Sequence, residues 1–270
     1  MRIFIFLSCL IVVLFFSTSV KENYMGIVSN ILSLSFVFGG TLIATLISFP
    51  AEKIKNLRHV IRNVYNTKPF DYVSTTKTII HIARDYRREG FRTVEETARE
   101  IKNPLLKVGL QLIADNCDWH RIKTALDKDY IFSRLQNDST ERIVRSMAKY
   151  APSFGLAGTI IGLMRIFPQL SQPENIGGAM SLALLTTLYG VLLANLIFLP
   201  LSNKMKDRNA DEEIVYQFIL EALHCIHQKE YSIVIEQRLS AIMPADAMQK
   251  YQSYRSDLAE SMHLSIAENS

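Results

Sequence analysis

The sequence predicts an all-α, polytopic inner-membrane protein with four transmembrane helices and a helical cytoplasmic domain. Apolar side chains gather in four blocks, with charged residues between and after them. A helix needs about 20 apolar residues to cross a bilayer core, and the last three blocks reach this length easily. No strand-rich region, internal repeat or low-complexity tract interrupts the helical pattern. The blocks lie near residues 3–20, 25–48, 151–171 and 177–201.

The blocks divide the chain into four parts. Residues 1–50 are expected to form a first transmembrane hairpin, 51–148 a cytoplasmic helical loop domain, 149–203 a second, channel-lining hairpin, and 204–270 a cytoplasmic helix and tail. The first block has a second interpretation, because "IFIFLSCLIVVLFF" has the length of a signal-peptide core and "STSV" resembles a cleavage region. Residues 1–20 are therefore either a retained helix or a cleaved signal.

Lysine and arginine residues predict the orientation. They follow the second block, precede the third and follow the fourth, and such flanks face the cytoplasm in most membrane proteins. Both termini and the 51–148 segment are then cytoplasmic. The net charge of +4 is a sign of this topology rather than of nucleic-acid binding, because no basic stripe carries interleaved aromatic residues.

The charged segments read as helices. "AEKIKNLRHVIRNVYN" predicts an amphipathic stalk after Pro50, and "NPLLKVGLQLIADNCD" and "DWHRIKTALDKDY" predict two more helices, the second capped by Asp118. Asp138 or Ser139 is expected to open a separate helix that runs into the third block. After Lys204, "DEEIVYQFILEALHCI" predicts another amphipathic helix.

No residue pattern points to catalysis. The six histidines are scattered, no glycine-rich phosphate loop is present, and the three cysteines show neither metal-ligand nor disulfide spacing. We expect no enzymatic activity, no metal and no cofactor apart from a transported ion.

Small and hydroxyl side chains form a stripe on each of the last two spans. In the third span the stripe is Gly155, Gly158, Thr159 and Gly162, which fall on one helix face; in the fourth it comprises Ala179, Ala183, Thr186, Thr187, Gly190 and Ala194. One interpretation is close helix packing, which small residues favour in lipid. The other is an ion path, walled by the hydroxyls of Thr159, Thr186 and Thr187.

The four apolar blocks contain no Asp, Glu or His. Proton relays inside membranes ordinarily use these groups, because they change charge at accessible pH. If the chain conducts protons, a partner helix must therefore supply the carboxylate. Arg165, the one charge inside a block, either reaches the outer interface along its flexible stem or lines the outer mouth of a path.

Two prolines fall at the cytoplasmic ends of these spans. Pro152 is expected at the start of the third-span helix, where a missing N–H is tolerated, and Pro200 at the end of the fourth, where it interrupts the helix. They either mark helix boundaries or form a coupling hinge.

Four stretches carry a family resemblance. "PSFGLAGTIIGLM", "GGAMSLALLTTLYGVLLANLIFLPLSNK", "FVFGGTLIATLISFPAEKIKN" and "RREGFRTVEETAREIKNP" resemble the third span, fourth span, second span and rotor-facing segment of the MotA/PomA family of flagellar motor stator subunits. That family belongs to the wider group that includes ExbB and TolQ. The resemblance covers about residues 34–104 and 149–208.

The resemblance implies an assembly and roles for membrane residues. Members form a pentamer around a MotB-like single-span partner, which supplies the ion-binding aspartate, and the ion flow turns the rotor through FliG. By position, Pro152 and Pro200 match prolines associated with coupling. Thr159 and Thr187 match hydroxyls associated with the ion path in the sodium-driven branch.

The resemblance also implies a rotor contact in the cytoplasm. Arg87 and Glu95, on either side of Gly90, match the charged pair that addresses the rotor. The alternative is that they are two solvated surface charges.

The sequence therefore favours a stator subunit that conducts H⁺ or Na⁺, with neither ion preferred. Two other functions stay open: an ExbB/TolQ-like energiser of envelope processes, and a non-conducting membrane scaffold whose small-residue stripes only pack helices.

Overall fold

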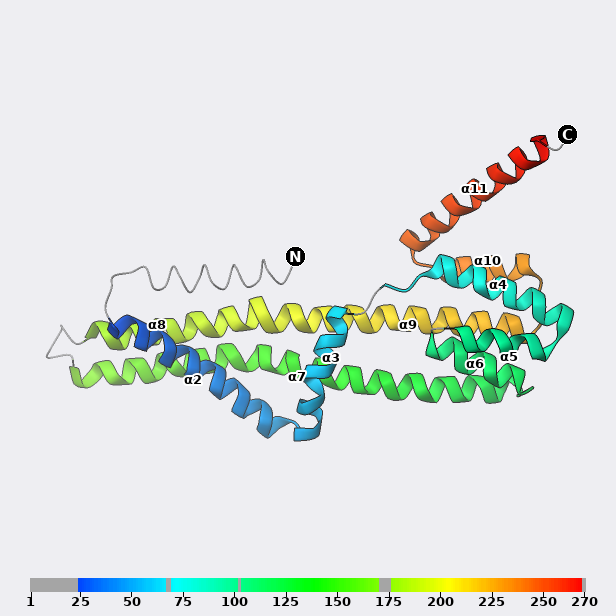
Figure 1. The fold of residues 1–270 in the computed structure, drawn as a ribbon. Coiled ribbons are helices and arrows are strands. Elements are labelled where there is room, and N and C mark those ends of the chain that lie inside the picture. Colours follow the sequence, from blue (N-terminus) through cyan, green and yellow to red (C-terminus); the bar gives the residue numbers. More distant parts are fainter. Residues whose placement is uncertain (1–23, 67–68, 102, 170–175, 269–270) are drawn as a thin grey trace. The chain divides into compact units, whose positions relative to one another are not determined.

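The computed structural model describes residues 24–66, 69–101, 103–169 and 176–268, and within these ranges it is helical with no strand (Figure 1). The all-α prediction is confirmed for the described part of the chain. The α-helices are α2 (Tyr24–Ser48), α3 (Ala51–Asn66), α4 (Tyr72–Glu89), α5 (Phe91–Glu100), α6 (Pro104–Ala114), α7 (Trp119–Ile166), α8 (Ile176–Leu192), α9 (Leu199–His227), α10 (Ser232–Ile242) and α11 (Ala245–Glu268). A 3₁₀ turn η1 (Phe167–Gln169) follows α7, and a π-helical segment η3 (Leu193–Phe198) joins α8 to α9.

The described residues form two compact units, each made of two stretches of sequence. The first unit comprises residues 24–66 and 136–207, and the second comprises residues 69–135 and 208–268, apart from the gaps given above. Two of the three boundaries, at 135/136 and 207/208, fall inside helices, so α7 and α9 each contribute to both units. The part boundaries expected at residues 50, 148 and 203 stay predictions.

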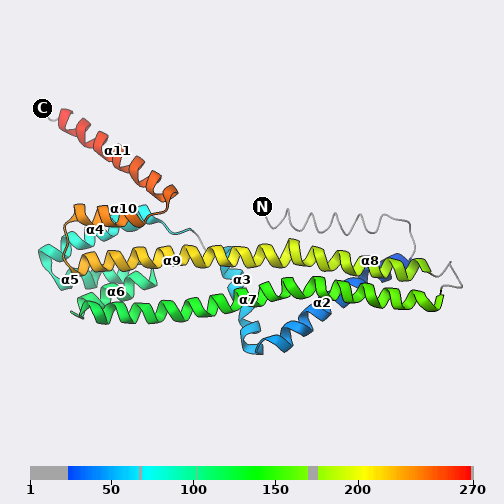
Figure 2. The ribbon, with the colours of Figure 1, turned by 180° about the vertical axis from the view of Figure 1, so that it is seen from behind.

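In the first unit α2 packs against α8, and α7 lies beside α8 in both ribbon views (Figure 1, Figure 2). Its core is built from α2, α7, η3 and α9. The buried residues are Val37, Ile143, Val144, Met147, Ala148, Ala151, Leu193, Ala194, Phe198 and Met205.

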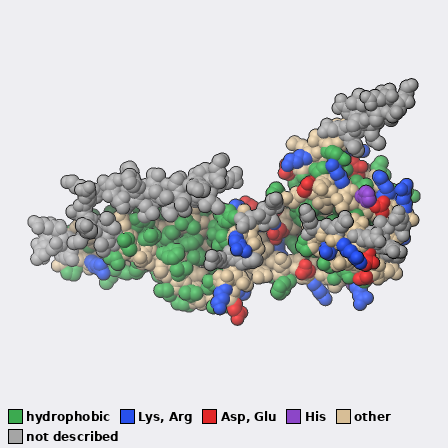
Figure 3. Space-filling view, in the orientation of Figure 1, with side chains coloured by type: hydrophobic (Ala, Val, Ile, Leu, Met, Phe, Trp, Pro, Cys, Tyr) green, Lys and Arg blue, Asp and Glu red, His purple; other side chains and the backbone are tan. Residues whose placement is uncertain are grey.

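Two described helical segments, Asn30–Ser48 and Ile176–His227, are long and apolar enough to cross a membrane. Large hydrophobic side chains are exposed on α2, between Met180 and Leu199, and on the neighbouring turns of α7, and the space-filling view shows hydrophobic side chains gathered over this unit (Figure 3). The first predicted block lies outside the described residues. The third block, on α7, is not one of these two segments. Four spans are therefore not confirmed.

The helix α7 is continuous for 48 residues, which corrects two expectations. Pro152 lies inside α7 rather than at a helix start, and Asp138 and Ser139 are also interior, so neither opens a new helix. The sequence could not reveal this, because a charged stretch and an apolar stretch can share one helix. The predicted Asp118 cap is confirmed: its Oδ2 accepts from the His120 N–H at 3.1 Å.

Pro200 also differs from expectation, since the chain stays helical through it into α9. A proline has no N–H and its ring clashes with the carbonyl four residues earlier. The preceding turn is π-helical instead, and the Leu199 N–H bonds the Ala194 carbonyl. Across this turn the buried stripe advances four residues at a time, through Gly190, Ala194, Phe198 and Ser202. A regular α-helix would rotate such a stripe away from its partner, whereas the wider π turn keeps it facing inward.

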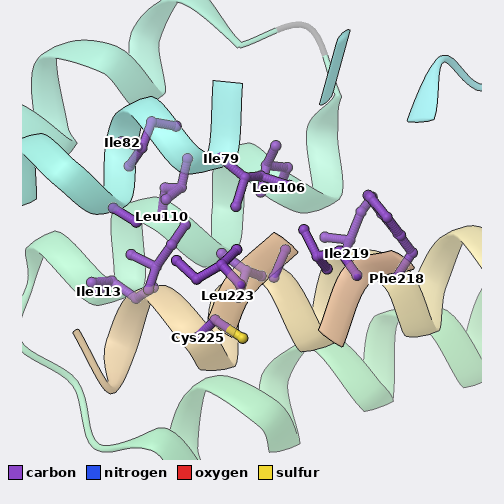
Figure 4. Close-up of a cluster of buried hydrophobic side chains, with 14 of the residues drawn as sticks. Ile79, Ile82, Leu106, Leu110, Ile113, Phe218, Ile219, Leu223 and Cys225 are labelled. Carbon is purple, nitrogen blue, oxygen red and sulfur yellow. The ribbon is translucent and has the colours of Figure 1, made fainter. Parts of the chain in front are cut away.

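The second unit encloses a separate core between α4, α5, α6, α9 and α10, with the start of α7 (Figure 4). The side chains of Ile82, Leu110 and Leu223 are at most 1% exposed there. The Cys225 thiol is fully buried in the same cluster, and burial raises its pKa to about 12, with the nearby Glu230 and Glu221 carboxylates adding to the shift.

The turn between α4 and α5 depends on Gly90. Its φ of 81° and ψ of −155° lie in a region that only glycine occupies readily. A Cβ added there would meet nothing within 4 Å, so backbone conformation rather than space requires the glycine.

We predict that Gly90→Ala destabilises the second unit by about 1–3 kcal/mol. Maleimide labelling of Cys225 at pH 8 measures this, because the buried thiol stays protonated in the folded state and reacts when the unit opens. In a Cys9→Ser, Cys117→Ser background, labelling should accelerate roughly 5- to 150-fold. The matched control is Gly39→Ala in α2, where an added Cβ also meets nothing within 4 Å. Equal labelling rates in the two variants would contradict the prediction.

Candidate functional site

The site is built on a close approach of α7 and α8 in the first unit. A Cβ added to Gly190 would lie 2.7 Å from the Ala151 carbonyl oxygen, and one added to Gly155 would lie 2.9 Å from the Thr186 carbonyl oxygen. Both neighbours are backbone atoms, which cannot rotate away. These two glycines therefore let the helices approach each other more closely than any other residue would permit.

Two hydroxyl groups meet where the helices are closest. The side chains of Thr159 on α7 and Thr187 on α8 hydrogen-bond to each other. Both also reach the Gly155 carbonyl, at 3.2 Å from Thr159 Oγ1 and 3.3 Å from Thr187 Oγ1. Thr159 Oγ1 lies 3.4 Å from the Ala183 carbonyl as well. The pair thus forms a small cluster of oxygen atoms across the helix seam, with Thr187 exposed at its edge.

Thr186 is placed apart from this pair. It is 2% exposed and donates to the Ala183 carbonyl at 2.8 Å. A Cβ added to Gly158 would come within 2.6 Å of its side chain, and one added to Gly162 would lie 2.6 Å from the Ala183 Cβ. In this protomer Thr186, Gly158 and Gly162 therefore belong to the packed seam. Thr186 and Thr187 differ in their surroundings because neighbouring residues of a helix point about 100° apart.

The two prolines flank the seam differently. Pro152 lies on the α7 face that meets α8, and a Cβ added to Gly190 would be 3.2 Å from its Cα. Pro200 follows the π-helical segment and is half-buried. Arg165, in the last turn of α7, is exposed, and both interpretations of its role stay predictions.

The seam can bind cations or water but cannot titrate. The described residues 30–48, 142–169 and 176–206 contain no Asp, Glu or His. Hydroxyl and carbonyl oxygens are suitable ligands for a partly dehydrated cation or a file of water, but they cannot hold a mobile proton at neutral pH. These described residues therefore supply no carboxylate to the seam.

Two polar contacts in the first unit were missed by the sequence analysis. The Tyr189 hydroxyl donates to Asn30 Oδ1 at 2.9 Å and links α8 to α2. The Glu141 carboxylate, 13% exposed, accepts from Ser202 Oγ at 2.6 Å and from Arg145 Nε at 2.8 Å. Asn30 could have been noticed as an amide inside an apolar block, but no sequence signal gives its partner.

The second unit carries the predicted charged pair on two successive helices. Arg87 lies in the last turn of α4, with its guanidinium 4.3 Å from the centre of the Tyr231 ring. Glu95 on α5 pairs with Arg99 at 2.9 Å, and the Glu95 side chain is 58% exposed. Gly90 reverses the chain between them, so both charges lie close to one turn of the fold.

Comparisons with known proteins agree with this arrangement. A model of the MotA/TolQ/ExbB proton channel family matches residues 97–217. The chain is 31% identical to motility protein A of Aquifex aeolicus, over 79% of this chain and 85% of the relative. It is 30% identical to motility protein A of Cereibacter sphaeroides, over 78% and 82%. The fold matches the structure of the flagellar MotAB stator complex from Bacillus subtilis with a TM-score of 0.81 and 23% identity, over 93% of this chain and 99% of that chain.

We predict that Gly190→Ala forces α7 and α8 apart, because its Cβ would overlap the Ala151 carbonyl oxygen. Such overpacking typically costs about 1–3 kcal/mol, or a fall in Tm of roughly 2–10 °C for a chain of this size. The Tm of the detergent-solubilised protein checks this. Gly177→Ala is the matched control in α8, since its Cβ meets nothing within 4 Å. The prediction fails if both variants melt at the wild-type temperature.

Proposed function

The chain belongs to the motility protein A family, and on that premise we propose that it is a flagellar stator subunit that conducts H⁺ or Na⁺ and converts the flow into torque. The family is one of channel proteins, which confirms the expectation that the chain is not an enzyme. The relatives and the structural match are stator proteins of the bacterial inner membrane. We place both termini in the cytoplasm, as the flanking cations favour.

The observation that carries the proposal is the hydrogen-bonded pair of Thr159 and Thr187. Two hydroxyls and the Gly155 carbonyl gather at one point of an otherwise apolar seam. Packing alone would be satisfied by the glycines and alanines around them. A passing cation or water, in contrast, needs oxygen atoms at the surface of the helix pair, and the exposed Thr187 provides one.

The missing carboxylate is the reason to propose a partner. We assign it to a MotB-like single-span subunit whose aspartate would come to lie beside the hydroxyl pair. The matched solved structure is a MotAB complex, which supports a partner of this kind. A pentameric ring around that partner follows from the family resemblance.

To produce torque, a conformational change at the seam of α7 and α8 must be transmitted to the rotor. Pro152 lies one turn from Gly155 and against Gly190, so a change at the hydroxyl pair would be felt by the proline-containing turn. Pro200 follows the π-helical segment, the other irregular turn of the first unit. We propose that these two turns change conformation when the partner carboxylate gains or loses its charge. We also propose that Arg87 and Glu95 contact FliG.

Deletion of the gene should leave cells that build filaments but do not swim, in a strain with no second stator. The wild-type chain should restore swimming. Thr187→Ala should not restore it, because the hydroxyl is lost, whereas Thr187→Ser keeps the hydroxyl and should retain at least half of the swimming speed. Immunoblots control for protein level.

Each other outcome points to a different function. Normal swimming of the deletion strain would remove the flagellar function and favour an envelope energiser. Full rescue by Thr187→Ala would remove the ion path through this hydroxyl and favour a scaffold.

A second experiment tests the rotor contact. Glu95→Lys should lower swimming speed several-fold if Glu95 faces the rotor. The change removes the i, i+4 pair with Arg99, which is worth only about 0.2–0.5 kcal/mol, so the protein should still fold. Asp115→Lys, another exposed carboxylate of the second unit, is the matched control. Equal swimming with both variants would count against a rotor role for Glu95.

A further inference from the structure

An apolar patch lies on a charged part of α7 in the second unit. The side chains of Ile131, Phe132 and Leu135 are 54%, 72% and 59% exposed, and their spacing places them on one helix face. Lys128, one turn earlier, is exposed on the same face. These four residues are called the α7 patch. Neither the proposed ion path nor the rotor charges account for it.

A groove of about 1360 Å³ lies on the other side of the same helix, within the second unit. The helix α7 contributes Asp129, Tyr130, Ser133 and Arg134 to it, at positions that alternate with those of the patch. At about 100° per residue these two sets point in roughly opposite directions. One protomer therefore presents the patch on one side and the groove on the other.

The groove suits an apolar surface that carries a positive charge. Its floor includes the half-buried side chains of Phe70, Tyr72 and Val215. Five carboxylates and two guanidinium groups line it, and both guanidinium groups already pair with carboxylates, Arg134 with Glu213 and Arg208 with Glu212. The pKa of the Tyr72 hydroxyl is raised by burial and by the nearby Asp211 and Asp246, in agreement with an acidic groove. The lining carboxylates are Asp71, Asp129, Asp211, Glu212 and Asp246.

We propose that the α7 patch of one copy of this chain seats in the groove of a second copy. Phe132 and Leu135 would cover the aromatic floor, and Lys128 would lie among the carboxylates. The occupant is another copy because the same protomer supplies both complementary surfaces, apolar to apolar and basic to acidic. Contacts between two different surfaces repeat head to tail and close into a ring when the rotation permits. The inference rests on the proposed stator function and names the contact that would join neighbouring subunits of its ring.

A cysteine pair tests this contact in membranes of cells that produce the full chain. Leu135→Cys places a thiol in the patch and leaves Phe132 and Lys128 in place, while Ser74→Cys places one at the exposed edge of the groove. The background carries Cys9→Ser and Cys117→Ser, and the buried Cys225 is kept. Oxidation should convert the chain with both cysteines into a ladder of dimers and larger species on a non-reducing gel.

Single-cysteine chains separate the possible geometries. Each variant alone should give no adducts above background, and Leu135→Cys combined with Asp115→Cys, which lies outside the groove lining, should also give none. Strong dimers from Leu135→Cys alone would overturn the head-to-tail contact in favour of a symmetric one. Absence of adducts from the Leu135 and Ser74 pair would overturn the proposal altogether.

Two matched lysine variants test how much charge contributes to the contact between copies. Lys128→Glu should lower the yield of adducts at least threefold at low salt, whereas Lys123→Glu, an exposed lysine of the same helix outside the patch, should leave it unchanged. Equal yields from both variants would overturn the role of Lys128. Swimming of the same strains distinguishes the two proposals. No adducts from a chain that restores swimming would refute the contact alone, and adducts in a strain whose swimming does not need the chain would refute the stator function alone.

Discussion

The close approach of α7 and α8 is the constraint on which the candidate site depends. In lipid, helices gain little from burying apolar side chains against each other, so association relies on tight packing and on hydrogen bonds between helices. Gly155 and Gly190 permit the contact, and only at that separation can Thr187 reach the Gly155 carbonyl and the Thr159 hydroxyl together. The same contact holds Pro152 against α8. A packing requirement and a chemical requirement are thus met by one set of small residues.

Threonine hydroxyls in the first unit differ in where their hydrogen bonds go. Thr41 and Thr45 are buried and donate to carbonyls one turn earlier in their own helix, at 2.6 and 2.7 Å, which makes them compatible with apolar surroundings. Thr187 instead bonds across to the facing helix and stays exposed. A hydroxyl satisfied by its own helix has little to offer a passing ion. One that spans a seam can exchange its partner for a cation or water without leaving a backbone group unpaired.

Composition and spacing predicted the helical class and the Asp118 cap, since each depends on residues near one another in the sequence. Spacing could not separate Thr186 from Thr187, because adjacent residues with the same hydroxyl differ only in where the neighbouring helix lies. It also failed at the prolines. Pro152 and Pro200 were expected at helix ends, yet both helices continue, because the tertiary packing of the first unit outweighs a lost hydrogen bond. The Glu141–Ser202 and Asn30–Tyr189 contacts join residues far apart in the sequence, which a pattern in one sequence cannot reveal.

The π-helical segment sets the register between α8 and α9. Gly190, Ala194, Phe198 and Ser202 stay buried on a four-residue step only because the turn between them holds more than the usual 3.6 residues. If the same sequence were a regular α-helix, the residues beyond Phe198 would turn by about 100° relative to α8 and would present the wrong side chains to α7. Deletion of one residue between Ala194 and Phe198 would change the steps to four, three and four residues, which a regular α-helix keeps on one face. The segment therefore accommodates one extra residue without changing which side chains beyond it face α7.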